Sequence, residues 1–98
     1  MQVRLTDQAS DDLFSIWAHI ASDSLRNADE CVDRIMKRAV RLADFPRLGP
    51  ARSNVAAGAR FLVVQRWLVI YRVTSREIRI VRIVDASRDL NSLDIPQA

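Results

Sequence analysis

The hydrophobic period of this chain changes once, and that change constrains the fold more than any other feature. Up to Phe45, apolar residues recur at helical spacing in two segments, the first beginning after Thr6 and the second near Asn27. From Arg60 onward, three short runs rich in Val, Ile, aromatic residues and Arg are typical of β-strands. Helical segments followed by separate strands indicate an α+β fold.

Both helical segments are amphipathic and the second has the stricter pattern. The first is expected to run to about Ser22. The second is expected to begin at a capping box formed by Asn27 and Glu30 and to end before Pro46. The link between them is short, which favours an antiparallel helical hairpin. The apolar stripes consist of Ala9, Leu13, Ile16, Trp17 and Ile20 in the first segment, and Ala28, Val32, Ile35, Ala39 and Leu42 in the second.

The expected strands define the rest of the architecture. Residues 1–5 suit an edge strand, and the later strands cover 60–64, 67–73 and 78–84. The predicted fold is α+β with the order β-α-α-β-β-β, a helical hairpin packed on a mainly antiparallel sheet. Because 98 residues fit one core, residues 1–98 are expected to form a single domain.

Strand alternation predicts a sheet with two apolar faces. If Val64 pairs with Trp67 and Val73 with Ile78, the two faces separate cleanly, and the hairpin can cover only one of them. The other face should then be an open apolar groove with arginines. The first face collects Arg60, Leu62, Val64, Trp67, Val69, Tyr71, Ile78, Ile80, Arg82 and Val84; the second collects Phe61, Val63, Leu68, Ile70, Arg72, Arg79, Val81 and Ile83.

The same register sets Arg60 beside Tyr71 and Arg72 opposite Arg79. Two like charges in direct opposition destabilise a sheet, so the second pair calls for an acid or an anionic ligand nearby. In the alternative interpretation, the arginine stems lie along the sheet edge with their charged ends in water.

Composition narrows the class of partner and the compartment. The chain has 15 Lys and Arg against 12 Asp and Glu, a net charge of +3, which suits either a nucleic acid or an acidic protein. Since 14 of the 15 bases are Arg, a compositional bias of the genome also explains the excess. A single cysteine, Cys31, and no long apolar run favour a cytoplasmic protein without membrane insertion.

The residues offer little for assembling a catalytic or metal site. His19, Cys31 and scattered Asp do not make a metal site, and no glycine-rich phosphate loop is present. One catalytic possibility survives, a metal-free ribonuclease in which Arg60 and Arg82 stabilise charge on a phosphate and Tyr71 transfers a proton.

The order of several short motifs resembles the ParE branch of the RelE/ParE toxins of bacterial type II toxin-antitoxin systems. Each motif is weak alone, but their order and spacing extend over nearly the whole chain. They are Ala9, Asp12–Leu13, Ile16–Trp17, Ile20–Ala21, Leu42–Gly49, Gly58–Arg60, Tyr71–Val73, Ile80–Ile83 and Arg88–Leu90.

The resemblance implies a toxin that inhibits DNA gyrase without a cofactor and is neutralised by a ParD-like antitoxin. Contact with DNA would then come only through the antitoxin. Residues expected to meet the target are Arg60, Tyr71, Arg82 and Arg88. A folding antitoxin tail suits the open sheet face, at Leu62, Val64, Trp67, Val69 and Ile80.

Two alternatives to a gyrase inhibitor are compatible with the sequence. RelE-like relatives are ribosome-dependent mRNA endoribonucleases, and an inactive module that only sequesters an antitoxin is the other possibility. Many ParE-like chains carry a His-Gly pair where Asp85 and Ala86 stand here. This difference leaves the fold assignment intact, but the way in which the C-terminal segment of those relatives meets its target does not transfer in detail to this chain.

Overall fold

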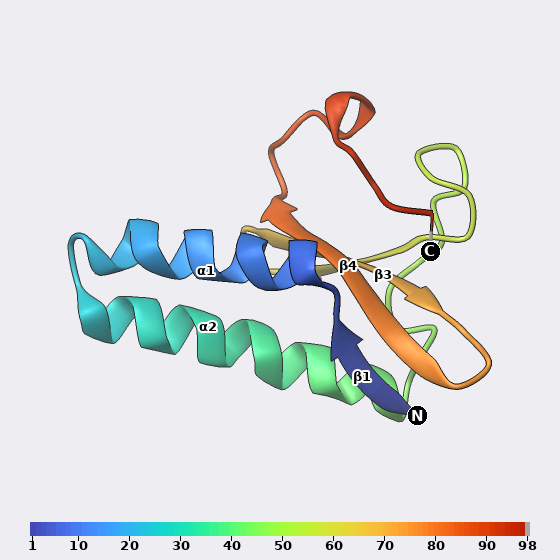
Figure 1. The fold of residues 1–98 in the computed structure, drawn as a ribbon, viewed down its shortest axis with the longest axis horizontal. Helices are drawn as coiled ribbons and strands as arrows, with labels where there is room; N and C mark the ends of the chain where they lie inside the picture. The colour runs from blue at the N-terminus through green and yellow to red at the C-terminus, as the bar shows by residue number, and fades with distance from the viewer. Residues whose placement is uncertain (98) are drawn as a thin grey trace.

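The computed structural model describes residues 1–97 and has the predicted order of elements (Figure 1). The sheet has the order β1-β4-β3-β2, with β1 parallel to β4 and the other neighbours antiparallel. The α+β prediction and its mainly antiparallel sheet are therefore confirmed. The elements are β1 (Gln2–Leu5), α1 (Asp7–Ala21), α2 (Leu25–Val40), β2 (Arg60–Val64), β3 (Trp67–Val73) and β4 (Glu77–Asp85), with 3-10 turns η1 (Arg41–Ala43) and η2 (Leu90–Ser92).

Side-chain caps define where both helices begin. The Thr6 hydroxyl accepts a hydrogen bond from the Ala9 N–H at 3.2 Å, as the sequence indicates. The second helix begins earlier than expected, because Ser24 caps it and accepts from the Asn27 N–H at 3.1 Å. The predicted capping box at Asn27 is wrong, and Glu30 instead forms a helix-surface ion pair with Arg26 at 3.1 Å.

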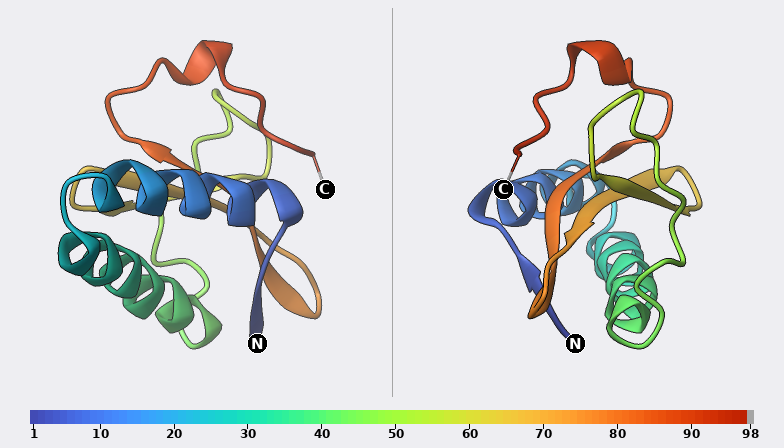
Figure 2. Two further views of the ribbon diagram at one scale, coloured as in Figure 1. Left: turned by 60° about the vertical axis from the view of Figure 1, so that its left-hand side comes forward. Right: turned by 90° about the vertical axis from the view of Figure 1, so that its right-hand side faces the viewer.

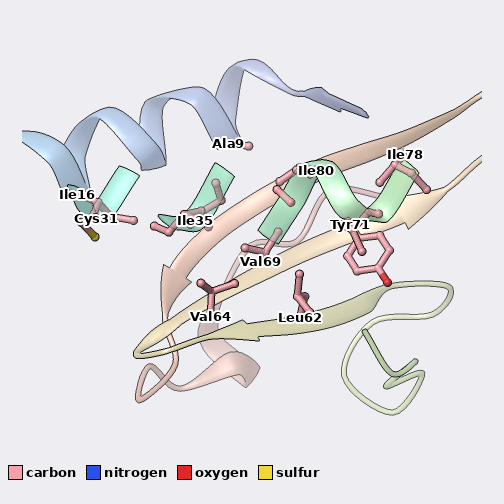
Figure 3. Packing of buried hydrophobic residues seen from close by; sticks show 13 residues of the cluster. Ala9, Ile16, Cys31, Ile35, Leu62, Val64, Val69, Tyr71, Ile78 and Ile80 are labelled. Carbon is pink, nitrogen blue, oxygen red and sulfur yellow. The ribbon is translucent and has the colours of Figure 1, made fainter. Parts of the chain in front are cut away.

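The apolar stripes of α1 and α2 pack on one face of the sheet to form the larger core cluster. Figure 3 shows Leu62, Val64 and Val69 between the strands and the helices. Each such side chain contributes roughly 1.5–3 kcal/mol relative to an exposed position. The buried members are Ala9, Ile16, Cys31, Ile35, Ala39, Leu42, Leu62, Val64, Val69, Tyr71, Ile78, Ile80 and Ile83.

The chain itself covers the second face of the sheet. The loop before β2 and the segment after β4 lie together on the side of the sheet away from α2 (Figure 2). Val55, Ala56, Leu90 and Ile95 from these segments pack on the cluster, which also holds the buried Leu93. The expectation of an open apolar sheet face is therefore wrong. The buried members are Ala59, Phe61, Leu68, Ile70, Val81, Val84 and Leu93.

A β-bulge in β4 changes which residues share a face. The pairs Val64–Trp67, Val73–Ile78, Arg60–Tyr71 and Arg72–Arg79 occur as predicted. Between Ile70 and Tyr71 the register shifts, however: Tyr71 pairs with Ile80 whereas Ile70 pairs with Arg82.

The extra residue of the bulge is Val81, and it alters the rest of β4. Ile83 joins the cluster under the helices, and Val84 joins the opposite cluster. Arg82 consequently leaves the face on which alternation placed it with Arg60 and Tyr71. The predicted three-residue group on one face is wrong for this reason.

Candidate protein-interaction surface

Tyr71 anchors a loop from inside the core. Its side chain is fully buried, and its hydroxyl donates to the Pro46 carbonyl at 2.7 Å and accepts from the Gly49 N–H at 2.9 Å. Burial raises the pKa of Tyr71, against the opposing effects of the Gly49 hydrogen bond and the Arg60 charge. The expectation that Tyr71 faces an open cleft toward a target is therefore wrong.

Arg60 lies beside Tyr71 and supports the same loop. Its guanidinium donates to the Gly49 carbonyl at 2.9 Å, and the residue is half-buried. A β-carbon at position 49 would lie 2.9 Å from the Tyr71 ring and 3.0 Å from the Leu62 nitrogen, so only glycine fits there. These contacts assign Arg60 a structural role, and its contact with a target stays a prediction.

Arg82 forms a buried ion pair with α1. Its Nε and one terminal nitrogen donate to the two Asp12 carboxylate oxygens at 2.8 and 3.1 Å, and both side chains are about nine-tenths buried. The Asp12 carboxylate also accepts from the Ile83 N–H at 3.0 Å, while Arg82 donates to the Asp94 carbonyl at 2.7 Å. Arg82 therefore connects α1, β4 and the C-terminal segment, and it does not face an open surface as predicted.

Arg72 performs a similar role on the second sheet face. It donates to the carbonyls of Pro96 and Ala57 and so connects the two covering segments. The acid that the Arg72–Arg79 opposition calls for is Glu77, which pairs with Arg79 at 3.0 Å and with Arg4 at 3.1 Å. The Arg79 hydrogen bond is the main cause of the lowered pKa of Glu77.

Arg88 is the only residue of the predicted target-binding set that is exposed. It follows β4, where its N–H donates to the Asp85 carbonyl at 3.0 Å. The neighbouring Asp89 caps η2 by accepting from the Asn91 N–H at 3.0 Å. Arg88 is accessible to a partner, and its role stays a prediction.

The residues predicted to hold an antitoxin lie mainly beneath the helices. Leu62, Val64, Val69 and Ile80 are all at most 4% exposed and belong to the larger core cluster. Trp67 is half-buried, with the Arg66 guanidinium 4.9 Å from its ring centroid. The prediction that these five residues line an open groove is wrong, because α1 and α2 cover the sheet face to which they point.

A partly exposed apolar surface lies on the outside of the helical hairpin. We define the hairpin surface as Leu5, Leu13, Phe14, Trp17 and Val32, which together with Ser10 line a hollow of about 290 Å³. Phe14 is 66% exposed and stacks on Trp17 with 6.1 Å between ring centroids. An exposed aromatic ring stacked on a partly buried one at a hollow is typical of protein-binding surfaces.

One hydrogen bond fixes the orientation of this surface. The Trp17 indole N–H donates to the Asp29 carboxylate at 2.9 Å across the hairpin, which holds the ring that Phe14 stacks on. The sequence contains the signal for this surface, because Phe14 is a large apolar residue outside the stripe of its helix. Leu13, Trp17 and Val32 belong to the stripes expected to face the core and Phe14 belongs to neither stripe, so the stripes do not predict this surface.

Two further features of residues 1–97 bear on function. No three His, Cys, Asp or Glu side chains in this part of the chain are grouped so as to hold a metal ion. No helix among these residues is both long and apolar enough to cross a membrane.

The arrangement of two helices on this four-stranded sheet defines a small α+β fold of the RelE/ParE type. A family model described as the ParE toxin of type II toxin-antitoxin system, parDE, matches residues 3–90. The chain belongs to this family. The resemblance seen in the sequence is thereby confirmed, and the chain is a ParE-type toxin of a type II toxin-antitoxin system.

Individual relatives agree with this membership. Toxin ParE3 of Caulobacter vibrioides is 33% identical over 86 residues, which make up 87% of this chain and 86% of that protein. A solved structure described as the chromosomal ParDE TA system from P. aeruginosa matches with a TM-score of 0.78 and 26% sequence identity. That match covers 89% of this chain and 97% of the other.

Proposed function

We propose that this toxin inhibits DNA gyrase by binding it and is neutralised by a ParD-like antitoxin that docks on the hairpin surface. Family membership supports the toxin and its pairing with an antitoxin. The observation that carries the docking site is the exposed Phe14 ring, stacked on the partly buried Trp17 at a hollow between α1, α2 and β1. An amphipathic helix laid in a groove of this kind is a recurring mode of protein recognition.

Phe14 can serve as an anchor residue for a partner. Phe14 is 66% exposed, and an aromatic side chain of its size buries roughly 150–250 Å² in full. Covering the exposed part removes on the order of 130 Å² from water, worth about 3 kcal/mol at 25 cal/mol per Å². The stacked Trp17 is held by Asp29 before the partner arrives, so little ordering of side chains opposes the binding.

Inhibition by binding fits this structure better than mRNA cleavage does. The two groups expected to act on a phosphate are already engaged, Tyr71 with the loop at Pro46 and Arg82 with Asp12. A buried tyrosine with a raised pKa is poorly suited to remove a proton at neutral pH. This geometry gives the ribonuclease alternative no specific support.

A supercoiling assay with purified gyrase tests the proposal. We expect the toxin to abolish negative supercoiling of relaxed plasmid, or to accumulate cleaved DNA, and the cognate antitoxin to reverse the effect. A translating extract run in parallel should keep its message intact. Unchanged gyrase activity would refute the proposed target, and cleaved message would establish the ribonuclease alternative instead.

A further inference from the structure

A second apolar surface lies at the end of the helical hairpin, in the loop between η1 and β2. Residues 45–48, which we call the 45–48 loop, line a hollow of about 390 Å³. Phe45 is 54% exposed, Leu48 is 41% exposed, and Val40 at the end of α2 is 54% exposed. Three large apolar side chains thus remain in water within one short stretch of chain.

This loop is held rigidly although its own apolar side chains contribute little to the core. The buried Tyr71 hydroxyl binds the loop at the Pro46 carbonyl and the Gly49 N–H, and Arg60 donates to the Gly49 carbonyl. The Leu48 N–H donates to the Phe45 carbonyl at 3.1 Å, which closes the turn. A surface fixed in this way loses little conformational freedom when a partner binds.

Cationic groups flank the apolar side chains. Residues 37–48 contain four bases and one acid, a net charge of +3. Lys37 pairs with Asp33, but Arg41 and Arg47 have no carboxylate partner within residues 1–97. The Arg41 guanidinium lies 5.7 Å from the Phe45 ring centroid, so charge and aromatic surface form one patch.

We infer that the 45–48 loop is the surface with which this toxin contacts its target, and that it docks on an acidic protein surface with an apolar recess. This inference rests on the proposed function and adds the location and chemistry of the contact. An apolar centre flanked by arginines matches the usual anatomy of a protein interface, where Phe and Arg are enriched. Nucleic acid is the poorer occupant, because phosphates would pair with the arginines and leave Phe45 and Leu48 in water.

The test uses two exposed substitutions and two matched controls. Phe45→Ala removes the apolar centre and Arg47→Glu reverses a flanking charge. Val63→Ala and Arg76→Glu make the same kinds of change at exposed positions in β2 and in the β3–β4 turn. For each variant the measurements are the toxin concentration for half-inhibition of gyrase supercoiling, the growth arrest on induction, the affinity for antitoxin, and the midpoint of thermal unfolding.

We expect Phe45→Ala and Arg47→Glu each to raise the half-inhibitory concentration about tenfold or more and to relieve growth arrest, with antitoxin affinity and unfolding midpoint unchanged. The control variants should behave as the wild type. Equal inhibition by all variants would overturn the inference, as would a loss of antitoxin affinity with inhibition preserved. Wild-type binding to plasmid DNA that Arg47→Glu abolishes would identify nucleic acid as the occupant and overturn it too.

The two proposals fail in distinguishable ways. If the wild type arrests growth without affecting gyrase, the proposed target is wrong, and the growth measurement still decides whether the 45–48 loop meets the actual target. If the wild type inhibits gyrase and Phe45→Ala does so equally, only the inferred contact surface is wrong.

Discussion

Replacing Arg82 by alanine should destabilise this protein severely, because it breaks an ion pair that the fold buries. The Asp12 carboxylate, about nine-tenths buried, receives two hydrogen bonds from Arg82 and one from the Ile83 N–H. In the variant it would keep only the last, and the Asp94 carbonyl would lose its donor. Leaving one partner of a buried pair unpaired costs about 3–5 kcal/mol.

The size of this loss is large relative to the stability of a small domain. Native domains have free energies of unfolding of about 5–15 kcal/mol, so Arg82→Ala removes about 30–50% of a mid-range value of about 10 kcal/mol. Each kcal/mol shifts the unfolding midpoint of a domain of this size by about 4–8 °C, which predicts a drop of at least about 12 °C. Urea denaturation followed by tryptophan fluorescence, with Trp17 and Trp67 as reporters, measures the free energy directly.

Arg26→Ala is the matched control for this prediction. Arg26 forms an ion pair with Glu30 at 3.1 Å on the exposed face of α2, and such surface pairs contribute about 0.2–1 kcal/mol. Arg82→Ala should therefore cost several times more than Arg26→Ala. If both variants lost the same free energy of unfolding, less than about 1 kcal/mol, the claim that Arg82 connects three elements of the fold would be refuted.

Three other outcomes follow from the contacts described. Tyr71→Phe should lose about 1–3 kcal/mol in urea denaturation, because the buried Gly49 N–H and the Pro46 carbonyl lose their partner; an unchanged midpoint would contradict this. Phe14→Ala should leave stability within about 0.5 kcal/mol, as a surface substitution does, while weakening antitoxin binding at least about tenfold in a calorimetric titration. Acid should destabilise the protein through Asp85 and Glu77. Hydrogen bonds from Arg66 and Ser87 lower the pKa of Asp85, and the pKa of Glu77 is lowered as well. The stabilisation by these two carboxylates is complete above the ordinary carboxyl pKa of about 4 and is lost as the pH falls below it. Urea midpoints between about pH 6 and pH 2 check this sign, and Asp85→Asn should flatten the acid side of the profile.

The fold could be predicted because its elements depend on local patterns. The stripes of α1 and α2 specify the element type and the buried helix face, and the runs of β2 and β3 specify the element type. The hairpin pairs Val64–Trp67 and Val73–Ile78 follow from two short turns. Even the Arg72–Arg79 opposition and its need for an acid could be foreseen, and Glu77 supplies that acid.

The site could not be predicted, for two physical reasons. The bulge at Val81 has no signature in the alternation of β4, and it moves Arg82 out of the face assigned to it. The segments that cover the second sheet face are irregular, so their apolar residues, such as Val55 and Leu93, show no period to follow. The prediction of an open groove took the two helices as the only cover for the sheet, whereas these irregular segments cover its second face.

Antitoxin docking on the hairpin surface is measured by the restoration of gyrase supercoiling, with wild-type toxin and Phe14→Ala toxin compared at concentrations that inhibit gyrase equally. With toxin at a concentration no higher than the wild-type dissociation constant of the complex, the antitoxin concentration for half-restoration should be at least about ten times higher against Phe14→Ala than against the wild type. Superimposable restoration curves would contradict antitoxin docking on the hairpin surface, and no inhibition by the wild type would contradict gyrase as the target.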